Sequence, residues 1–365
     1  MPEPQILSPR RLNRILLARQ LLLARRRMPV PAAIEYLVGM QSQSPRSCYV
    51  GLWSRVSGFR PPALEGLMLS REAVRIALMR STIHLVTARD CLPLRELVQP
   101  AVSRTTHHTN VRRNAGVDAQ ELARLGRELV DAEPRTLAEL GELLHERWPA
   151  CDPFALAMGV RELVPLVQAP PRGLWTSGGE ARHVDAARWL EGRPPRPATL
   201  DTLVLRYLAA YGPASILDAQ MFTGLTGLRD VFGRLRPQLR TFLDDTGREL
   251  YDLPDAPLPT ARTRAPVRFL PEFDNVLLSH ADRRRILPDG TLSLLSLGNG
   301  LTPALLVDGF VAGAWKLRRA TRSVTLEVRP FERLPAQARL DVEEEGRRLL
   351  RFAAPAAERT AVTVA

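Results

Sequence analysis

Two stretches of the chain repeat one short pattern, and this pattern restricts the fold more than any other feature of the sequence. In the first stretch, Thr136 stands three residues before Glu139, which is the spacing of a helix-capping box, and Trp148-Pro149 stops the helix. A second helical run over residues 153–163 leads into a basic turn at 170–175, which we expect to feed a strand. Helix, turn, helix, basic turn and strand in this order predict a winged helix.

The second stretch has the same order with clearer turn residues. Residues 203–208 have a helical pattern, and Tyr211-Gly212-Pro213 ends that helix. Ser215 is placed to cap a short helix that closes at Gly224. A tight helix pair joined through a glycine turn is typical of helix-turn-helix units, although many winged helices bind proteins rather than DNA.

Proline-rich segments mark the borders of these stretches. Residues 193–197 separate the two, and residues 254–266 separate the second from a C-terminal region. We therefore expect a mixed α/β fold, mainly α, with tandem winged-helix motifs and a β-rich C-terminal element. The expected parts are an N-terminal helical or winged-helix region at 1–130, winged helices at 131–192 and 198–253, and the β-rich region at 266–365.

The β-rich expectation rests on alternation and on turn residues. Residues 324–328 alternate apolar and polar side chains, as a half-buried strand does. Asp-Gly pairs at 289–290 and 308–309 are strong signals for tight hairpins. A small barrel is one arrangement of such strands, and a helix over residues 335–352 would close the region.

The charge of the chain favours a polyanionic partner. The net charge is +12, and DNA is the commonest polyanion in the cytoplasm. Lysine occurs once, at Lys316, so nearly every cation is arginine, which a GC-rich coding bias also produces. Charge alone therefore leaves DNA binding open. No apolar run approaches the roughly 18–20 residues that cross a bilayer, and no signal-peptide pattern is present, so we expect a cytoplasmic protein.

The N-terminal segment leads into an unusual pair of amides. A helix docked on the core accounts for residues 10–28 better than a basic amphipathic helix on a membrane does. A second helix that begins near Pro31 would place Gln41 on its apolar face. If the chain is extended after Gly39, Gln41 and Gln43 point to the same side and their amides can converge on one spot. The alternative is that they cap the helix end and bond to the backbone.

Several kinds of chemistry are missing from the sequence. The cysteines, Cys48, Cys91 and Cys151, lie far apart, and no Cys or His pair has zinc spacing, so we expect neither a disulfide framework nor a metal site. The motifs of serine hydrolases are absent, and we expect no cofactor. His84 lies within an apolar run and is either a core residue or part of a cleft.

Four short segments, in order along the chain, resemble landmarks of the AlkZ-like DNA glycosylases. They are residues 38–45 continuing to 52–55, residues 80–85, residues 270–275 with 282–285, and residues 308–315. The resemblance extends over most of the chain. The family carries a Gln-x-Gln motif in one branch and Gln-x-Asp in the other, and Gln41-Ser42-Gln43 is similar to the first. Ser42 departs from the aliphatic middle residue of that motif, which puts the local packing in doubt.

The resemblance implies a fold and an activity. The family has tandem winged helices and a β-rich element that enclose duplex DNA. Its members are monofunctional glycosylases that excise N7-alkylated purines, and some unhook interstrand crosslinks made by antibiotics, which could serve self-resistance in a producer. For this chain the resemblance implies catalysis by Gln41 and Gln43 without metal or cofactor, in a nucleoid-associated protein that we expect to be a monomer.

The implied substrate agrees with the chemistry of two amides. A normal purine leaves as an anion and needs an acid, whereas an N7-alkylated guanine is already cationic and leaves neutral. Two glutamines cannot act as a general base at neutral pH, but their oxygens can accept hydrogen bonds from a water and hold it in line with the anomeric carbon. Their carbonyl dipoles also favour the developing positive charge.

The other candidate residues have weaker support. Arg283, Arg284 and Arg285 form a basic hairpin that is suited to phosphates, or is only a solvated hairpin. Arg80 and His84 could approach the lesion strand, and Asp274 could structure a loop beside the site. Two other functions remain open. A winged-helix transcriptional regulator would bind DNA without base release, and a protein-interaction module would bind DNA weakly with little salt dependence.

Overall fold

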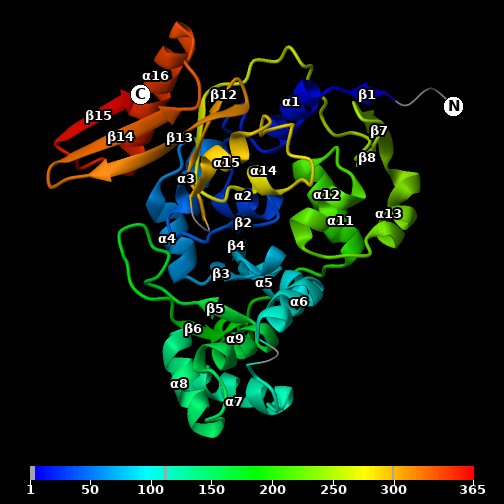
Figure 1. Ribbon diagram of the computed structural model, residues 1–365, viewed down its shortest axis with the longest axis vertical. Helices are drawn as coiled ribbons and strands as arrows, with labels where there is room; N and C mark the ends of the chain where they lie inside the picture. The colour runs from blue at the N-terminus through cyan, green and yellow to red at the C-terminus, as the bar shows by residue number, and fades with distance from the viewer. Residues whose placement is uncertain (1–4, 111–112, 298–299) are drawn as a thin grey trace.

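The computed structural model describes residues 5–110, 113–297 and 300–365 and shows an elongated molecule (Figure 1). It confirms a mixed fold of helices and strands. One order of elements occurs three times along the chain: a helix, a short bridging segment, two further helices and a two-stranded antiparallel hairpin. We call these the first, second and third units.

The first unit lies inside the N-terminal region. Its elements are α2 (Val30–Tyr36), β2 (Met40–Gln41), α3 (Ser47–Arg55), α4 (Pro61–Leu69), β3 (Ala73–Ala77) and β4 (Ile83–Thr87). The bridging strand β2 pairs with β4, the second strand of the hairpin. Before this unit come β1 (Ile6–Leu7) and α1 (Pro9–Arg19), and after it α5 (Ala88–Leu97) and α6 (Gln99–Asn110).

The second unit contains the first stretch that the sequence singled out. Its elements are α7 (Ala119–Ala132), α8 (Leu137–Arg147), α9 (Pro153–Leu163), β5 (Leu166–Gln168) and β6 (His183–Asp185), followed by α10 (Ala186–Trp189). The capping box of Thr136 and Glu139 is confirmed, as are the bounds of the second helix. The basic turn at 170–175 does not lead directly into a strand: it comes after β5 and lies in the long connection to β6. Helix α7 crosses the border drawn at residue 130 and packs on α9, so it goes with this unit.

The third unit matches the second stretch closely. It consists of α11 (Leu200–Tyr211), α12 (Ile216–Thr223), α13 (Arg229–Leu235), β7 (Arg240–Asp244) and β8 (Glu249–Asp252). Ser215 caps α12, and Gly224 ends it in the left-handed conformation at φ +79°, as the sequence predicted. The bridging residue of the third unit is Ala214, which pairs with β8, and that of the second is Arg135, which pairs with β6.

A shared sheet joins the first and second units, whereas the hairpin of the third unit pairs with the N-terminal strand. Strands β3 and β5 pair, so the first and second units share one five-stranded sheet in the order β2-β4-β3-β5-β6. Strand β1 extends the hairpin of the third unit by parallel pairing with β7. Figure 1 shows the second unit at the end of the molecule opposite the C-terminal sheet.

The C-terminal region is an open sheet and not the small barrel that the sequence suggested. Its order is β15-β14-β13-β12-β9, so β15 and β9 are edges that do not pair with each other. The strands are β9 (Arg268–Leu270), β12 (Ala304–Val307), β13 (Phe310–Arg319), β14 (Ser323–Pro330) and β15 (Arg359–Val364). Helix α16 (Ala336–Ala353) buries Val342 and Leu349 in one core with Leu326 of the sheet, so the helix covers the face that barrel closure would have enclosed.

The two Asp-Gly pairs behave differently. Asp308-Gly309 forms the expected hairpin turn between β12 and β13, with both residues at positive φ. The hairpin expected at Asp289-Gly290 is wrong, because Gly290 begins α15 (Thr291–Leu295). Short elements complete the region: α14 (Asn275–Leu278), β10 (Ser296–Leu297) and β11 (Gly300–Leu301).

The first helix is shorter than the sequence suggested. Helix α1 ends at Arg19, where Leu21 adopts φ +58° and the amide of Leu22 bonds to the carbonyl of Leu17 at 2.8 Å. This is a Schellman-type ending, and it turns Leu21 and Leu22 into the core. The helix is docked by its buried face, as expected. Within the described residues no helix is long and apolar enough to span a bilayer.

Candidate functional site

A strained backbone turn precedes Gln41 and positions it at the site. After α2 the chain passes through Val38 at φ +56° and Gly39 at φ +84°. A β-branched residue rarely adopts this conformation, and the strain is held by a bond from the Gly39 amide to the Ile34 carbonyl at 2.9 Å. Gly39 also has no room for a side chain, because a Cβ there would lie 2.8 Å from Val86. The extended segment that the sequence predicted therefore begins at β2.

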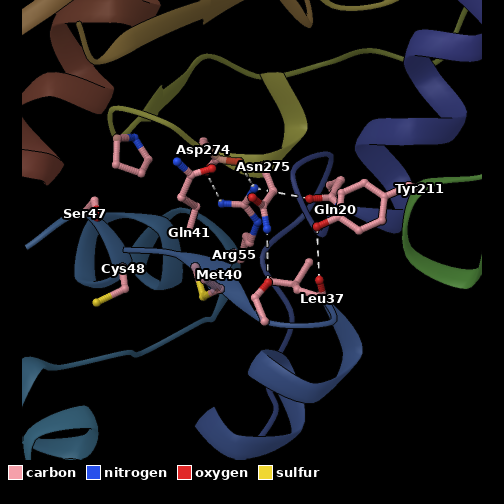
Figure 2. Close-up of a pocket in the computed structure, with 12 residues that line it drawn as sticks. Gln20, Leu37, Met40, Gln41, Ser47, Cys48, Arg55, Tyr211, Asp274 and Asn275 are labelled. Atoms are coloured by element: carbon pink, nitrogen blue, oxygen red, sulfur yellow. Dashed lines mark hydrogen bonds and ion pairs between the residues drawn. The ribbon is translucent and has the colours of Figure 1, made fainter. Parts of the chain in front are cut away.

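Gln41 is buried beside a small polar pocket. The residues that line it are Gln20, Leu37, Gly39, Met40, Gln41, Ser47, Cys48, Arg55, Tyr211, Pro271, Asp274 and Asn275. Figure 2 shows Gln41, Arg55, Asp274 and Asn275 gathered near its centre, with Gln20 and Tyr211 to one side. The free space is about what a single water molecule needs.

Asp274 is the one carboxylate among these lining residues, and both of its oxygens are engaged. Arg55 donates to them from Nη1 at 2.8 Å and Nη2 at 2.7 Å, a bidentate ion pair in which both side chains are buried. Asp274 also caps α14 by accepting a bond from the Val276 amide at 3.0 Å. This geometry supports the role expected from the sequence, which is to structure a loop beside the site.

Arg80 contacts Gln41 directly. Its Nη2 donates to Gln41 Oε1 at 2.7 Å and to Asn275 Oδ1 at 3.3 Å, and its Nη1 donates to the Phe222 carbonyl at 2.6 Å. No carboxylate lies within ion-pair distance of Arg80 in the described residues. Burial lowers the pKa of its guanidinium to about 10, so it stays charged at neutral pH.

The turn that carries Arg80 is itself strained. It joins β3 to β4, and both Arg80 and Ser81 have positive φ, at +57° and +58°. Tight hairpins normally use Gly or Asn at such positions. Gly224 packs against this turn, where a Cβ would come within 3.1 Å of the Arg80 amide nitrogen. Strained non-glycine residues of this kind concentrate at functional sites.

Gln43 lies in a different environment from Gln41. It is exposed and does not line the pocket, and its Oε1 accepts a bond from the Ile83 amide at 3.2 Å. Both glutamines are held at the start of β4, Gln43 through its side-chain amide and Gln41 through its backbone, which pairs with His84 in the β2–β4 ladder. The backbone bond that the sequence left open as an alternative is therefore present for Gln43.

His84 is a buried residue next to this cluster. Its Nδ1 lies 3.0 Å from the Thr82 carbonyl, and its Nε2 is buried with no hydrogen-bond partner in the described part of the chain. Burial lowers the pKa of the imidazole to about 3, with the charge of Arg80 acting in the same direction. The ring is therefore neutral at physiological pH.

The three consecutive arginines diverge. Arg285 is buried and donates to the Pro213 carbonyl at 2.7 Å, with Asp218 at 3.9 Å. Arg284 pairs with Asp282 at 2.8 Å and with Asp245. Arg283 is half-buried, and its charge acts on Arg80. The structure brings only Arg283 of this triplet near the pocket cluster.

Sequence reasoning missed two residues of the site, Arg55 and Asn275. Each lies inside a segment that carried the family resemblance, which was the available signal. Asn275 accepts from Arg80 and donates to the Gly39 carbonyl at 3.2 Å, so it ties the two strained turns together. No cluster of three or more metal-ligating side chains occurs in the described ranges.

Comparisons with known proteins agree over most of the chain. The family model described as "DNA glycosylase AlkZ-like" matches residues 34–352. Among solved structures, the DNA glycosylase AlkZ of Streptomyces sahachiroi is similar with a TM-score of 0.80 and 22% sequence identity. The match covers 99% of this chain and 100% of that one, which shows a shared fold. A search of curated proteins finds no match.

Proposed function

The chain belongs to the AlkZ-like DNA glycosylase family, and from this membership we propose that it hydrolyses the N-glycosidic bond of N7-alkylated purines in duplex DNA. Gln41 and Gln43 position the attacking water, and the product is an abasic site. Neither metal nor cofactor takes part. Unhooking of interstrand crosslinks, as in antibiotic self-resistance, is the more specific form of this activity.

The observation that carries the proposal is the lack of a free acid at the pocket, within the residues that the structure describes. Asp274 is held by Arg55 through both oxygens, and the lowered pKa of His84 leaves a neutral ring. Burial raises the pKa of the Tyr211 hydroxyl, which makes it a poorer acid still. These groups therefore supply no proton to a departing purine. The site suits a base that is already cationic and leaves as a neutral molecule.

The amides suit the attacking side of the reaction. An oxocarbenium-like carbon is electrophilic enough to accept a neutral water, so the water needs orientation more than deprotonation. Arg80 fixes the Gln41 amide, and the Ile83 backbone fixes that of Gln43. The second lone pair of each amide oxygen can then accept from the water without any reorganisation of the side chain.

The size of the pocket supports substrates with bulky adducts. Its free space holds about one water and excludes a purine ring. In this proposal the damaged base stays outside the pocket, and the attacking water is held between Gln41 and Gln43. A crosslinked or enlarged base is then no harder to accommodate than a methylated one, in contrast to enzymes that bind a flipped base in a snug pocket.

Two further features support the finer parts of the proposal. A bifunctional glycosylase uses an amine nucleophile to form a Schiff base, and the sole lysine of the sequence is Lys316 on β13, which is exposed and pairs with Glu327. This supports monofunctional hydrolysis. The three units each have the element order of a winged helix, and we propose that they act as DNA-binding modules of a monomer.

The test is release of 7-methylguanine from methylated duplex DNA. We expect release by the wild type and a loss of about 10²–10³-fold in rate for Gln41→Ala, with DNA affinity retained. Gln43→Ala should also lose rate. Gln337→Ala, an exposed glutamine on α16, serves as the matched control and should behave as wild type. DNA binding without any release by the wild type would favour the transcriptional regulator instead.

A further inference from the structure

A buried arginine lies behind the Gln-Ser-Gln segment. Arg75 of β3 is 1% exposed, and its contacts converge on Ser42. Its Nη2 donates to the Ser42 carbonyl at 2.7 Å, and its Nε donates to the Ser42 hydroxyl at 3.2 Å. The serine is fully buried. The middle residue of the motif, which is unusual in being polar, thus has a specific partner.

The register of the sheet separates Arg75 from the two glutamines. Residues directly opposite in neighbouring strands share a face. Arg75 and Met40 both lie opposite Leu85, whereas Gln41 lies opposite His84. Because side chains alternate along a strand, Ser42 faces the side of Arg75, and Gln41 and Gln43 face the other side. The amide of Ser42 continues the ladder by donating to the Ile83 carbonyl at 2.7 Å.

Arg75 is costly to keep in this position. No carboxylate lies within ion-pair distance of it in the residues that the structure describes, and its Nη1 is buried without a hydrogen-bond partner. Burial lowers the pKa of its guanidinium, which reflects the loss of hydration. An apolar side chain would fill the same space without this penalty. The arrangement is therefore explained by what Arg75 holds, which is the peptide between the two glutamines.

We propose that Arg75 is a positioning residue that fixes the Ser42 peptide from the back of the sheet and thereby sets Gln41 and Gln43 in their working orientation on the front. This inference rests on the proposed glycosylase function. Arg75 touches neither water nor DNA in this role. Its loss should therefore slow base release without weakening DNA binding, since a misplacement of about 1 Å at reacting groups can cost up to 10²-fold in rate.

The test compares single-turnover release of 7-methylguanine and DNA affinity across matched variants. Arg75→Met should lower the rate by about 10- to 100-fold and leave the dissociation constant for DNA within about twofold. Arg75→Lys, which keeps a cationic donor at this position, should recover part of the rate. The control is Arg95→Met, because Arg95 is equally buried but bonds to Gln99 and to the Glu162 carbonyl on other helices.

A double-mutant cycle separates positioning from general destabilisation. In a Gln41→Ala background Arg75→Met should cause little further loss, because the group that it positions is gone. Equal losses in both backgrounds, or equal losses for Arg75→Met and Arg95→Met, would overturn the inference while the proposed function stands. If the wild type releases no base, both the proposed function and this inference are overturned. Should Arg75→Met fail to fold, wild-type rates for both Arg75→Lys and Ser42→Ala would also overturn it.

Discussion

The first and third units have the same order of elements, but the arginines at their hairpins have opposite kinds of partner. At the third unit, Arg19 enters from α1 and meets Asp252 of β8 in a bidentate pair at 2.6 and 2.7 Å. At the hairpin of the first unit, Arg75 is buried and Arg80 is half-buried, and their partners are carbonyls, a hydroxyl and amides. A compensated charge in the interior holds elements together. An uncompensated one is a cost that the fold tolerates where function requires it.

Backbone strain also differs between the hairpins of the first and third units. The hairpin of the third unit turns through Gly247 at φ +79°, which glycine adopts freely. The hairpin of the first unit turns through Arg80 and Ser81, which do not. The residue at the bridging position also differs, since the third unit has Ala214 where the first has Gln41. One framework thus serves stability in one copy and, in our proposal, chemistry in the other.

The largest expected effect concerns the compensated pair. Asp252→Ala leaves Arg19 buried without its carboxylate, and we expect the free energy of unfolding to fall by about 3–5 kcal/mol in chemical denaturation. The rate of base release per folded molecule should stay unchanged. Asp201→Ala, at an exposed ion pair with Arg234, is the control and should barely move the denaturation midpoint. A marked loss of rate in folded Asp252→Ala would break the comparison.

The second prediction is the reverse of the first: a large loss of rate with a small loss of stability. Arg80→Met frees the Gln41 amide and should lower the single-turnover rate by about 10- to 100-fold. It should cost less than about 2 kcal/mol in unfolding free energy, because the lost hydrogen bonds are offset by removal of a poorly hydrated cation. Arg322→Met, on an exposed turn, should leave both quantities unchanged. An unfolding cost as large as that of Asp252→Ala, with the rate preserved, would make Arg80 a structural residue like Arg19.

Local patterns explain why the helices were predictable. The caps at Thr136, Ser215 and Gly224 involve residues three or four apart, and the structure confirms all three. The same holds for the hairpin at Asp308-Gly309. The prediction of a hairpin at Asp289-Gly290 was wrong because such a pair specifies a turn but not the element that follows it, and here that element is a helix.

Long-range contacts explain what the sequence could not provide. Arg55 and Asp274 are 219 residues apart, and Arg19 and Asp252 are 233 apart, so no spacing rule connects them. The difference between buried Gln41 and exposed Gln43 also depends on tertiary packing. The catalytic role of the glutamine pair was predicted through family resemblance, and Arg80 was predicted as a residue that could approach the lesion strand. The contact of Arg80 with Gln41, and the contacts of Arg75 with Ser42, became visible only in the fold.

The third prediction concerns pH and the buried histidines of the first and second units. The pKa values of His84 and His183 are lowered to about 3 and about 4 by burial, below the 6.5 of an unfolded chain. Between about pH 6.5 and 5 the unfolded state therefore binds protons that the folded state does not, and stability falls as pH falls, by up to about 1.4 kcal/mol per pH unit for each histidine. The rate of release should stay flat from about pH 6.5 to 9, because His84 is neutral and Arg80, with a pKa of about 10, is charged throughout.

Denaturation curves at several pH values test the first part of that prediction. His84→Gln should reduce the proton-linked slope by nearly one proton, while His145→Gln, at a half-buried surface position, is the control. A bell-shaped profile of the release rate within this range would mean that a titrating acid or base takes part. That outcome would contradict the argument for a substrate whose base leaves unaided.

The smallest expected effect concerns the arginine triplet, in which the presence or absence of a nearby carboxylate again distinguishes the three side chains. Arg285 has Asp218 nearby and Arg284 has Asp282, whereas Arg283 has no carboxylate within ion-pair distance in the described residues. A cation without a nearby carboxylate can bind a DNA phosphate. Arg283→Ala should therefore reduce the slope of log affinity against log salt by about 0.9. Arg284→Ala should change it less, because its charge is already neutralised locally. Arg285→Ala should lower the denaturation midpoint and leave the slope alone. Equal slope changes for all three would show that local ion pairs do not decide which arginines bind DNA.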